Sequence, residues 1–375
     1  MIPISIQMPF LLIFATESID MKRLLAASIL ILAMSCTGGY RQQSDTTCRY
    51  ASHFDIVKVD SAKAVVTISP YDGDRDTLKT DGPVDNIICM STSHIACLSE
   101  IGADSVITAV SGLGYVADPD ILRRRDIGKE GVKPIYDIGN EASLDYEKIV
   151  TLGPDLVVAY TVSSAEPPYI SKLRSLGVQV LVLHDHMENH PLARAEYIRL
   201  FGVLTGREQA ADSIFNEIAA RYESLASGVS VAQPWKVLIN IPYADAWYIP
   251  GQDNYMSRLI QDAGGEVLGS LQGRSSSSVI SLEDAWRLSQ EADIWLNPGH
   301  CDSRSKLASI HQLFPSFGPL QEELPIYNNT LRTTPEGGND FFESGAVRPD
   351  LILEDLIYIM SERSDKALHY FKLLR

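Results

Sequence analysis

Residues 190–227, HPLARAEYIRLFGVLTGREQAADSIFNEIAARYESLAS, divide this chain into two similar halves. Their apolar side chains recur every three or four residues, which is the period of an α-helix, at Tyr197, Leu200, Phe201, Leu204, Ala211, Ile214, Phe215, Ile218, Tyr222 and Leu225. Within the stretch, Thr205 and Glu208 have the spacing of a capping box. The pattern therefore predicts one helix that ends near Leu204 and a second helix of about twenty residues that begins at Thr205.

Short strand and helix patterns alternate on both sides of this stretch. The first half, residues 54–187, contains apolar strand candidates such as DLVVAYT and VQVLVLH, with the helix candidate YISKLRSLG between them. The second half, residues 229–375, repeats this order with WKVLINIP, SLEDAWRLSQ and ADIWLN. Such alternation is typical of mostly parallel sheets covered by helices on both faces. We therefore expect two three-layer α/β lobes, a helical linker over residues 188–228, and a ligand cleft between the lobes at the strand ends.

The N-terminal segment has the features of a secretory signal. Residues 21–23, MKR, are followed by the apolar run LLAASILILAM and by Ser35-Cys36, and this run is too short to span a bilayer. Cys36 resembles the lipidated cysteine of a bacterial lipobox, although Ala33 stands where leucine is usual; the alternative is a plain signal cleaved nearby. Residues 1–35 are interpreted as an upstream extension plus a lipoprotein signal, and the polar residues 36–53 as a flexible tether. These features predict a periplasmic protein that is attached to the cell envelope only through a lipid at Cys36.

Composition limits the classes of partner and of chemistry. The 375 residues carry a formal net charge of −16, which argues against a nucleic-acid partner because such a partner requires a basic surface. Disulfides are possible among Cys48, Cys89, Cys97 and Cys301 in an exported protein, but Cys89 and Cys97 lie in an apolar segment where a buried free thiol is commoner. The sequence lacks CxxC, P-loop, GxSxG and GxGxxG motifs. We expect a monomer with no resident cofactor, no metal and no catalytic activity.

Two groups of motifs resemble one known family. ICMSTSHIACLSEIGADSVITAVSG, LDYEKIVTLGPDLVVAY and SKLRSLGVQVLVL are similar to the first lobe of the helix-linked, class III periplasmic binding proteins of ABC importers for iron-siderophores, haem and cobalamin. AWYIPGQDNYMSRLIQDAGG, VISLEDAWRLSQEADIWLNPG and NDFFESGAVRPDLILEDL resemble the second lobe of Bacteroidetes-type lipoproteins of this family. The resemblance implies two lobes joined by a single long helix, with limited closure on the ligand. It also implies delivery of a ferric-siderophore, haem or cobalamin to an ABC importer permease dimer.

The resemblance assigns a docking role to two glutamates. In these importers each lobe presents one surface carboxylate to an arginine pocket on a permease subunit, and Glu147 in DYEKI and Glu283 in SLEDA stand at the matching positions. Each glutamate lies near the start of a predicted helix, where the helix dipole favours a carboxylate. The alternative is therefore a solvated acid in a first helical turn.

A large, partly aromatic ligand is held by aromatic faces and a few orienting polar groups. Candidates near the predicted strand ends are Ser93, His94, Tyr115 and Tyr160 in the first lobe, and Trp247, Tyr248, Trp295, Arg332 and Phe342 in the second. For each aromatic residue the alternative is core packing, and for Arg332 it is a structural salt bridge instead of a contact with a ligand carboxylate or phosphate. The loop STSHIACL departs from relatives of this family, which often carry a polar pair after the histidine.

The competing hypothesis is a metal site. His184, His186 and His190, with Asp185 and Glu188 between them, are the densest run of metal-ligand residue types in the chain. Such a run could hold zinc, with His300 or His311 completing the site, and could activate water in a hydrolase. The spacing does not fit the HxHxDH signature of metallo-β-lactamase-like enzymes, and the run lies where the first lobe meets the linker. A polar turn is the alternative interpretation.

Overall fold

The computed structural model describes residues 48–59, 62–79, 82–125, 133–243, 246–361 and 366–375. The described residues form one compact unit. Cys36, residues 1–35 and the predicted tether up to residue 47 lie outside the described residues. Among the described helices, none is both long and apolar enough to cross a bilayer.

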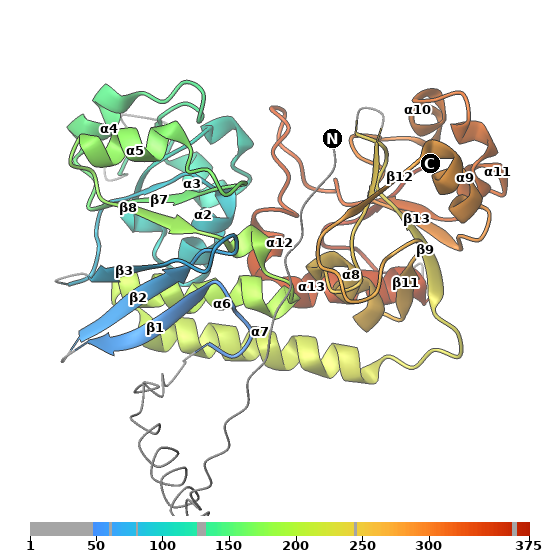
Figure 1. Cartoon of the computed structure of the whole chain (residues 1–375), viewed down its shortest axis with the longest axis horizontal. Coiled ribbons are helices and arrows are strands. Elements are labelled where there is room, and N and C mark those ends of the chain that lie inside the picture. Colours follow the sequence, from blue (N-terminus) through green and yellow to red (C-terminus); the bar gives the residue numbers. More distant parts are fainter. Residues whose placement is uncertain (1–47, 60–61, 80–81, 126–132, 244–245, 362–365) are drawn as a thin grey trace, which may run out of the picture. The chain divides into compact units, whose positions relative to one another are not determined.

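The first half of the chain builds two sheets (Figure 1). A small antiparallel sheet has the order β1–β2–β3, with β1 at Phe54–Val59, β2 at Ala62–Ile68 and β3 at Arg75–Lys79. A parallel sheet has the order β6–β5–β4–β7–β8, formed by β4 Ile87–Cys89, β5 Ile107–Val110, β6 Tyr136–Asp137, β7 Leu156–Tyr160 and β8 Val180–Leu183. Its helices are α2 Thr92–Glu100, α3 Pro119–Arg123, α4 Tyr146–Leu152 and α5 Pro168–Ser175. The strand order reverses direction between β4 and β7, as in a doubly wound fold.

The second half has a related doubly wound sheet with a different strand order. Its sheet has the order β11–β9–β13–β14–β15, formed by β9 Trp235–Ile239, β11 Gly265–Val267, β13 Ile294–Leu296, β14 Ile326–Asn328 and the antiparallel edge strand β15 Lys372–Leu373. A separate antiparallel pair joins β10 Trp247–Ile249 to β12 Ser278–Ile280. The helices are α8 Tyr255–Asp262, α9 Leu282–Ser289, α10 Arg304–Ser309, α11 Gly318–Gln321, α12 Ser344–Val347 and α13 Pro349–Met360. Here the strand order reverses between β9 and β13.

The linker consists of two helices, α6 at Pro191–Thr205 and α7 at Glu208–Gly228. Figure 1 shows α7 running beneath the elements of both halves. The predicted break is present, but the predicted capping box is wrong. The hydroxyl of Thr205 donates to the carbonyl of Phe201 as part of α6, and α6 ends at Gly206, whose φ of 69° few other residues adopt at low cost. The second helix therefore begins at Glu208 without a side-chain cap.

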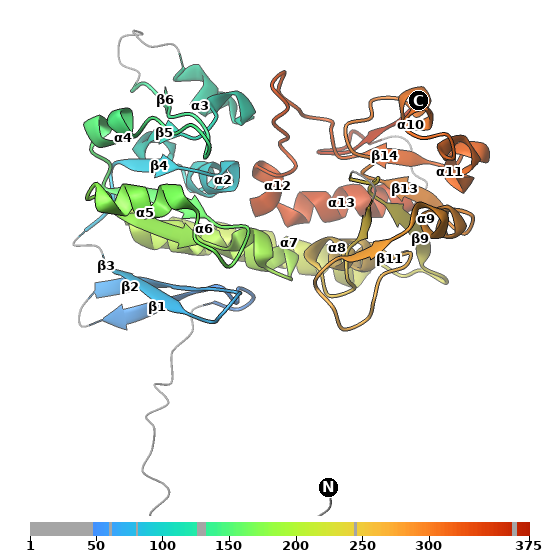
Figure 2. The same ribbon diagram turned by 45° about the horizontal axis from the view of Figure 1, so that its top comes forward.

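The linker helices belong to the main core. Leu200, Phe201 and Phe215 are buried in one apolar cluster with Ile87 of the first parallel sheet and Val237 of the second. A second cluster, which includes Ile88, Val157 and Tyr169, covers the other face of the first sheet. Because one cluster extends from the first sheet through α6 and α7 to the second sheet, the linker is part of the packed structure. Figure 2 shows the two sheets on either side of α12 and the start of α13.

The segment that precedes β1 is held by two buried carboxylates. Glu196 on α6 accepts hydrogen bonds from the backbone N–H groups of Arg49, Tyr50 and Ala51 at 2.7–2.8 Å. Glu188 accepts further bonds from the next two backbone N–H groups, at residues 52 and 53. The prediction of a tether that extends to residue 53 is therefore wrong at its end, because residues 49–53 are fixed against the linker.

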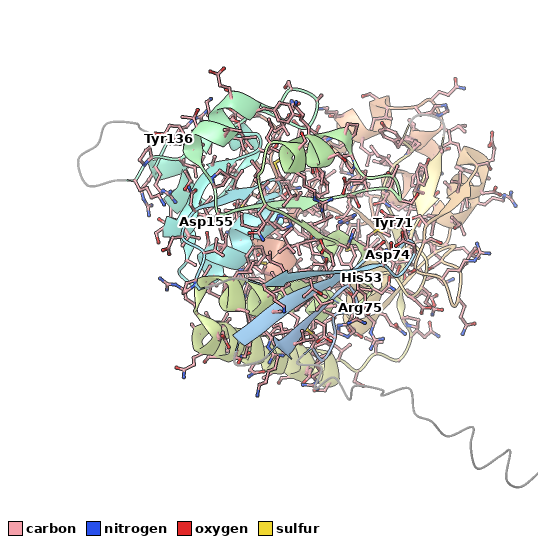
Figure 3. The ribbon with its side chains drawn as sticks, turned by 60° about the vertical axis from the view of Figure 1, so that its left-hand side comes forward. His53, Tyr71, Asp74, Arg75, Tyr136 and Asp155 are labelled. Atoms are coloured by element: carbon pink, nitrogen blue, oxygen red, sulfur yellow. The ribbon has the colours of Figure 1, made fainter. Side chains whose placement is uncertain are left out.

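The same segment leads into the small sheet. The carbonyl of His53 accepts a hydrogen bond from the N–H of Ile68, at the end of β2. Figure 3 shows His53 at this end of the sheet together with Tyr71, Asp74 and Arg75. The segment is thus joined both to α6 and to the sheet, so residues 49–53 belong to the folded part of the protein.

Candidate functional site

Two adjoining pockets lie at the carboxyl ends of the second-lobe strands. One has a volume of about 390 Å³ and is lined by second-lobe residues. The other has a volume of about 340 Å³ and includes Thr92 and Tyr115 from the first lobe. The pockets share four lining residues, His300, Thr330, Asn339 and Phe342. We call the two pockets together the interlobe cleft.

Two asparagines lie at the point where the second sheet reverses its strand order. Asn240 directly follows β9 and Asn297 directly follows β13, which are parallel neighbours. Both residues have positive φ angles, 67° and 55°, a conformation that asparagine tolerates better than most residues with a side chain. Because both residues line the 390 Å³ pocket, this pocket is at the position where ligands gather in open α/β sheets.

Two polar side-chain atoms of residues that line the cleft have no hydrogen-bond partner among the described residues. The Oδ1 atom of Asn297 and the Oγ1 atom of Thr330 are buried and have no hydrogen-bond partner among the described residues. The neighbouring Asn328 has a structural role, since its Nδ2 donates to the carbonyls of Gly299 and Cys301 at 2.7 and 2.8 Å. Asn328 therefore fixes the loop that carries His300 into the cleft.

The first-lobe wall is formed by a 3-10 turn at Leu113–Tyr115. The hydroxyl of Thr334 donates to the carbonyl of Gly114 at 2.7 Å. A Cβ atom on Gly338 would lie 2.1 Å from the carbonyl oxygen of Tyr115, so only glycine permits this close approach. The segment that precedes α12 thus contacts the first lobe directly.

A buried carboxylate joins the lobes next to these contacts. Glu343, whose side chain is 2% exposed, accepts hydrogen bonds from the backbone N–H groups of Ala117 and Asp118 at 2.7 and 2.8 Å. Burial raises the pKa of Glu343 to about 8, although the two N–H donors act in the opposite direction. The predicted residue set did not include Glu343, because its sequence position at the start of α12 gives no sign of burial.

Two predicted ligand residues lie on the walls of the cleft. Tyr115 is 53% exposed and Phe342 is 50% exposed, and both line the pocket that contains residues of the two lobes. Asn297 and Thr330 were not predicted. The signal that could have identified Asn297 is an asparagine immediately after a buried parallel strand, in the sequence WLNPG.

The two predicted tryptophans lie in the core. Trp247 and Trp295 are 1% and 0% exposed, and both stack on Phe317, at centroid distances of 5.8 and 5.5 Å. The indole N–H of Trp295 donates to the carbonyl of Asn240 at 2.7 Å. The prediction that these side chains contact the ligand is wrong, because both are fully buried and neither lines the two pockets. Trp295 instead supports the backbone at Asn240, which lines the cleft.

Two further predicted residues are buried on α2. Ser93 is buried and lies 2.9 Å from the hydroxyl of Ser91, which caps the helix. His94 is also buried, with its Nε2 atom 3.6 Å from Asp185 and its ring against Phe201. The structure therefore places both side chains inside the first lobe and not at the cleft, because they face the core side of the helix.

The remaining predicted ligand residues do not join the cleft. Arg332 pairs with Asp340 at 2.5 Å and stacks over Tyr370, which is the structural salt bridge of the alternative interpretation. Tyr160 is partly buried beside the ring of His186. Tyr248 is exposed on β10, outside the two pockets.

The sequence of this chain matches one protein family over most of the architecture described above. Residues 87–311, which include the first parallel sheet, the linker and β9 to β13, match the family described as periplasmic binding protein. The chain belongs to the periplasmic binding protein family. The resemblance read from the sequence is thereby confirmed, and so is the fold of two α/β lobes joined through a helical linker.

Curated relatives of this periplasmic binding protein include lipoproteins. An uncharacterized lipoprotein of Methanocaldococcus jannaschii is 24% identical over 301 residues, which are 77% of this chain and 68% of the relative. An uncharacterized ABC transporter substrate-binding lipoprotein of Bacillus subtilis is 24% identical over 207 residues, which are 54% of this chain and 60% of the relative. The protein is thus a periplasmic-type binding protein with lipoprotein relatives.

Solved structures share the fold of this binding protein. The vitamin B12 binding protein of Vibrio cholerae is 16% identical, with a TM-score of 0.53 over 74% of this chain and 98% of that chain. The haem binding protein of Vibrio cholerae is 18% identical, with a TM-score of 0.54 over 72% and 98%. The triscatecholate siderophore binding protein of Bacillus subtilis is 16% identical, with a TM-score of 0.55 over 77% and 96%. At these identities the likeness establishes the fold alone.

The histidine run does not support the hydrolase alternative. Among the described residues, no group of three or more His, Cys, Asp or Glu side chains is placed to hold a metal ion. The Nδ1 of His190 accepts a hydrogen bond from the N–H of Leu192 as the cap of α6. Burial and the neighbouring His186 lower the pKa of His184 to about 4. The family and its solved relatives are substrate-binding proteins and not enzymes.

The two predicted docking glutamates occupy equivalent positions in the two lobes. Glu147 is the second residue of α4, which Asp145 caps, and Glu283 is the second residue of α9, which Ser281 caps. Both glutamates are exposed, and neither forms an ion pair with another described residue. In Figure 1 both helices lie on the side of the view opposite α7. A carboxylate at the second position of a helix is favoured by the dipole and is free to accept hydrogen bonds from a partner.

Proposed function

We propose that this periplasmic binding protein captures an iron complex, haem or cobalamin in the interlobe cleft and delivers it to the permease dimer of an ABC importer. The observation that supports the proposal is the cleft, which combines strand-end residues of the second lobe with Thr92 and Tyr115 of the first. Relatives with this fold are described as binding vitamin B12, haem and a ferric siderophore. Another relative is described as the substrate-binding lipoprotein of an ABC transporter.

Docking in this proposal uses Glu147 and Glu283. Their matching positions on α4 and α9 would present one carboxylate from each lobe to an arginine pocket on each permease subunit. An exposed carboxylate gains strong, charge-assisted and often bidentate hydrogen bonds when it pairs with arginine. A symmetric pair of such contacts would fix the orientation in which a monomeric binding protein meets the permease dimer.

Attachment to the membrane in this proposal uses a lipid on Cys36. The lipoprotein relatives support it, as does the order of charged, apolar and small residues before Cys36. Residues 37–48 would connect the anchor to the segment that Glu196 holds. The binding protein would thus stay close to a membrane-embedded permease.

Ligand titration tests the function directly. Trp295 donates to the carbonyl of Asn240 at the floor of the cleft, so its fluorescence should report binding although its ring is buried. We expect saturable, submicromolar binding of at least one of a neutral ferric trihydroxamate, a ferric tris-catecholate, haem and cyanocobalamin, without turnover. Metal-dependent hydrolysis of a substrate that is lost in the His184→Ala, His186→Ala double variant would contradict the proposal.

A further inference from the structure

Each lobe presents an exposed apolar side chain three positions after its proposed docking glutamate. Val150 follows Glu147 on α4, and Trp286 follows Glu283 on α9. The valine is 48% exposed and the tryptophan is 37% exposed. Side chains three positions apart lie on the same face of a helix, so each glutamate and its apolar neighbour form one surface. We call each glutamate with its apolar neighbour a docking pair.

The burial pattern of the docking pairs is the same in the two lobes. In each helix the glutamate is exposed, the next residue is half-buried, the third is buried and the fourth is the exposed apolar residue. The buried third residues are Ile149 and Ala285, each 0% exposed, so the two helices lie on their lobes in the same register. A single exposed apolar residue is normal on a protein surface. Its repetition beside a carboxylate in both lobes indicates a partner that offers two equivalent surfaces.

The charged residues of the same helices leave the docking glutamates unpaired. Lys148 lies 3.4 Å from the capping residue Asp145, and Arg287 pairs with Asp284. Among the described residues, neither glutamate of the docking pairs has an ion-pair partner. Two exposed carboxylates without a counter-charge favour a partner whose matching surfaces are cationic.

The indole ring of Trp286 is held in position for contact with a partner. Its N–H donates to the carbonyl of Ser316 at 3.1 Å, and Ser316 ends a 3-10 turn that begins at the buried residue Phe314. Because the polar group of the ring is satisfied within the protein, a partner meets an apolar surface. A ring that is already fixed loses little conformational freedom on binding, and tryptophan is enriched among the residues that dominate interface energies.

We propose that Val150 and Trp286 are apolar contacts of the surface that docks on the permease dimer, one beside each docking glutamate. The inference rests on the proposed function and adds an apolar component to its docking surface. In Figure 1 both helices lie on the side of the view opposite α7, so one dimeric partner can meet both docking pairs. At each contact the apolar side chain would exclude water from the adjacent pair of glutamate and arginine, and the lower dielectric would strengthen that pair.

Association of the full-length protein with an importer tests this surface. The probe is the ABC importer that takes up the ligand in the same cells, purified in detergent as the permease dimer with its ATPase. We expect Trp286→Ala to raise the dissociation constant about 30-fold and Val150→Ala to raise it about threefold. Both factors should be equal at about 50 and about 500 mM NaCl, because salt screens charged pairs and not apolar contacts. The factor for the Glu147→Ala, Glu283→Ala double variant should instead shrink at the higher salt concentration.

Matched variants separate docking from stability. Val231 is 45% exposed and follows the end of α7 by three residues, so Val231→Ala should leave the association unchanged. Trp286→Phe keeps an aromatic ring and should recover most of the affinity that Trp286→Ala loses. If Trp286→Ala does not fold, Val150→Asp places a charge on the docking surface from an exposed position and should weaken the association at least about tenfold.

The outcomes separate this inference from the function on which it rests. If Val150→Asp and a folded Trp286→Ala bind the importer like the parent, while the double glutamate variant does not bind, the apolar contacts are refuted and the docking glutamates stand. Self-association of the parent that is lost in Trp286→Ala would assign the surface to a second copy of this chain and overturn the inference. If the parent does not bind the importer, both the inference and the proposed delivery to a permease fail.

Discussion

Replacement of Glu343 by glutamine should flatten the pH dependence of folding stability over a defined window. The carboxylate is buried between the lobes, and its pKa is raised from 4.5 to about 8. Between these pH values the folded protein holds a proton on Glu343 that the unfolded chain has released. Stability from this group is therefore fully present below pH 4.5 and is lost as the pH rises to about 8.

The expected loss of unfolding free energy follows from the pH range between the unfolded and folded pKa values of Glu343. Each pH unit corresponds to about 1.4 kcal/mol, so a window from 4.5 to about 8 corresponds to a loss on the order of 5 kcal/mol. The assay is urea unfolding at pH 5, 6, 7 and 8. Burial also raises the pKa of Glu188, to about 7, so Glu188 contributes to the pH dependence of stability in both the parent and the variant. The difference between the two proteins therefore reports the contribution of Glu343 alone.

A control variant is available in the same segment. Glu336 is exposed, so Glu336→Gln should keep the slope of the parent protein. If Glu343→Gln and the parent lose stability at the same rate from pH 5 to pH 8, the carboxylate does not carry the shifted proton and the reasoning is refuted. If the parent protein becomes more stable than the variant as the pH rises from 5 to 8, the predicted direction of the pH dependence is wrong.

Two further predictions concern stability and the division between core and cleft. Glu196→Gln should lower the free energy of unfolding by about 2–4 kcal/mol, because three backbone N–H groups lose an ionised acceptor. The backbone amides of residues 49–51 should also exchange hydrogen faster in this variant. Unchanged protection of these amides would contradict the prediction. Trp295→Ala should lower the free energy of unfolding, measured in urea, by about 3–5 kcal/mol because the ring is fully buried. Phe342→Ala removes a half-exposed ring, so it should change this free energy by less than about 1 kcal/mol and should weaken ligand binding. Equal losses of stability in the two variants would contradict this division between core and cleft.

Much of the fold was predictable because its strands and helices have strong local patterns. The apolar runs DLVVAYT and VQVLVLH became β7 and β8, and the amphipathic segment after Pro349 became α13. The very short strands β6 and β15 have no period to detect, and they form only because a neighbouring strand offers its edge. At the linker, the spacing of Thr205 and Glu208 fitted a cap, but Gly206 offered a lower-cost end to α6.

The site was less predictable than the fold because residue type does not determine burial. Trp295 and Phe342 are both aromatic residues near strand ends, yet one stacks in the core and the other faces the cleft. His94 looked like a ligand contact, but its face of α2 points toward α6 and Asp185. Asn297 was overlooked because a small polar residue after a strand is common, and only the parallel pairing of β13 with β9 places it beside Asn240.

Uptake by cells that carry the Glu147→Ala, Glu283→Ala double variant tests the central claim most directly. Each carboxylate that pairs with a permease arginine should contribute about 1.5–3 kcal/mol, so loss of both should abolish importer-dependent uptake of the bound complex. Ligand affinity should be unchanged, since α4 and α9 contribute no residue to the two pockets. The account predicts no uptake with full ligand binding; normal uptake by the double variant would contradict it.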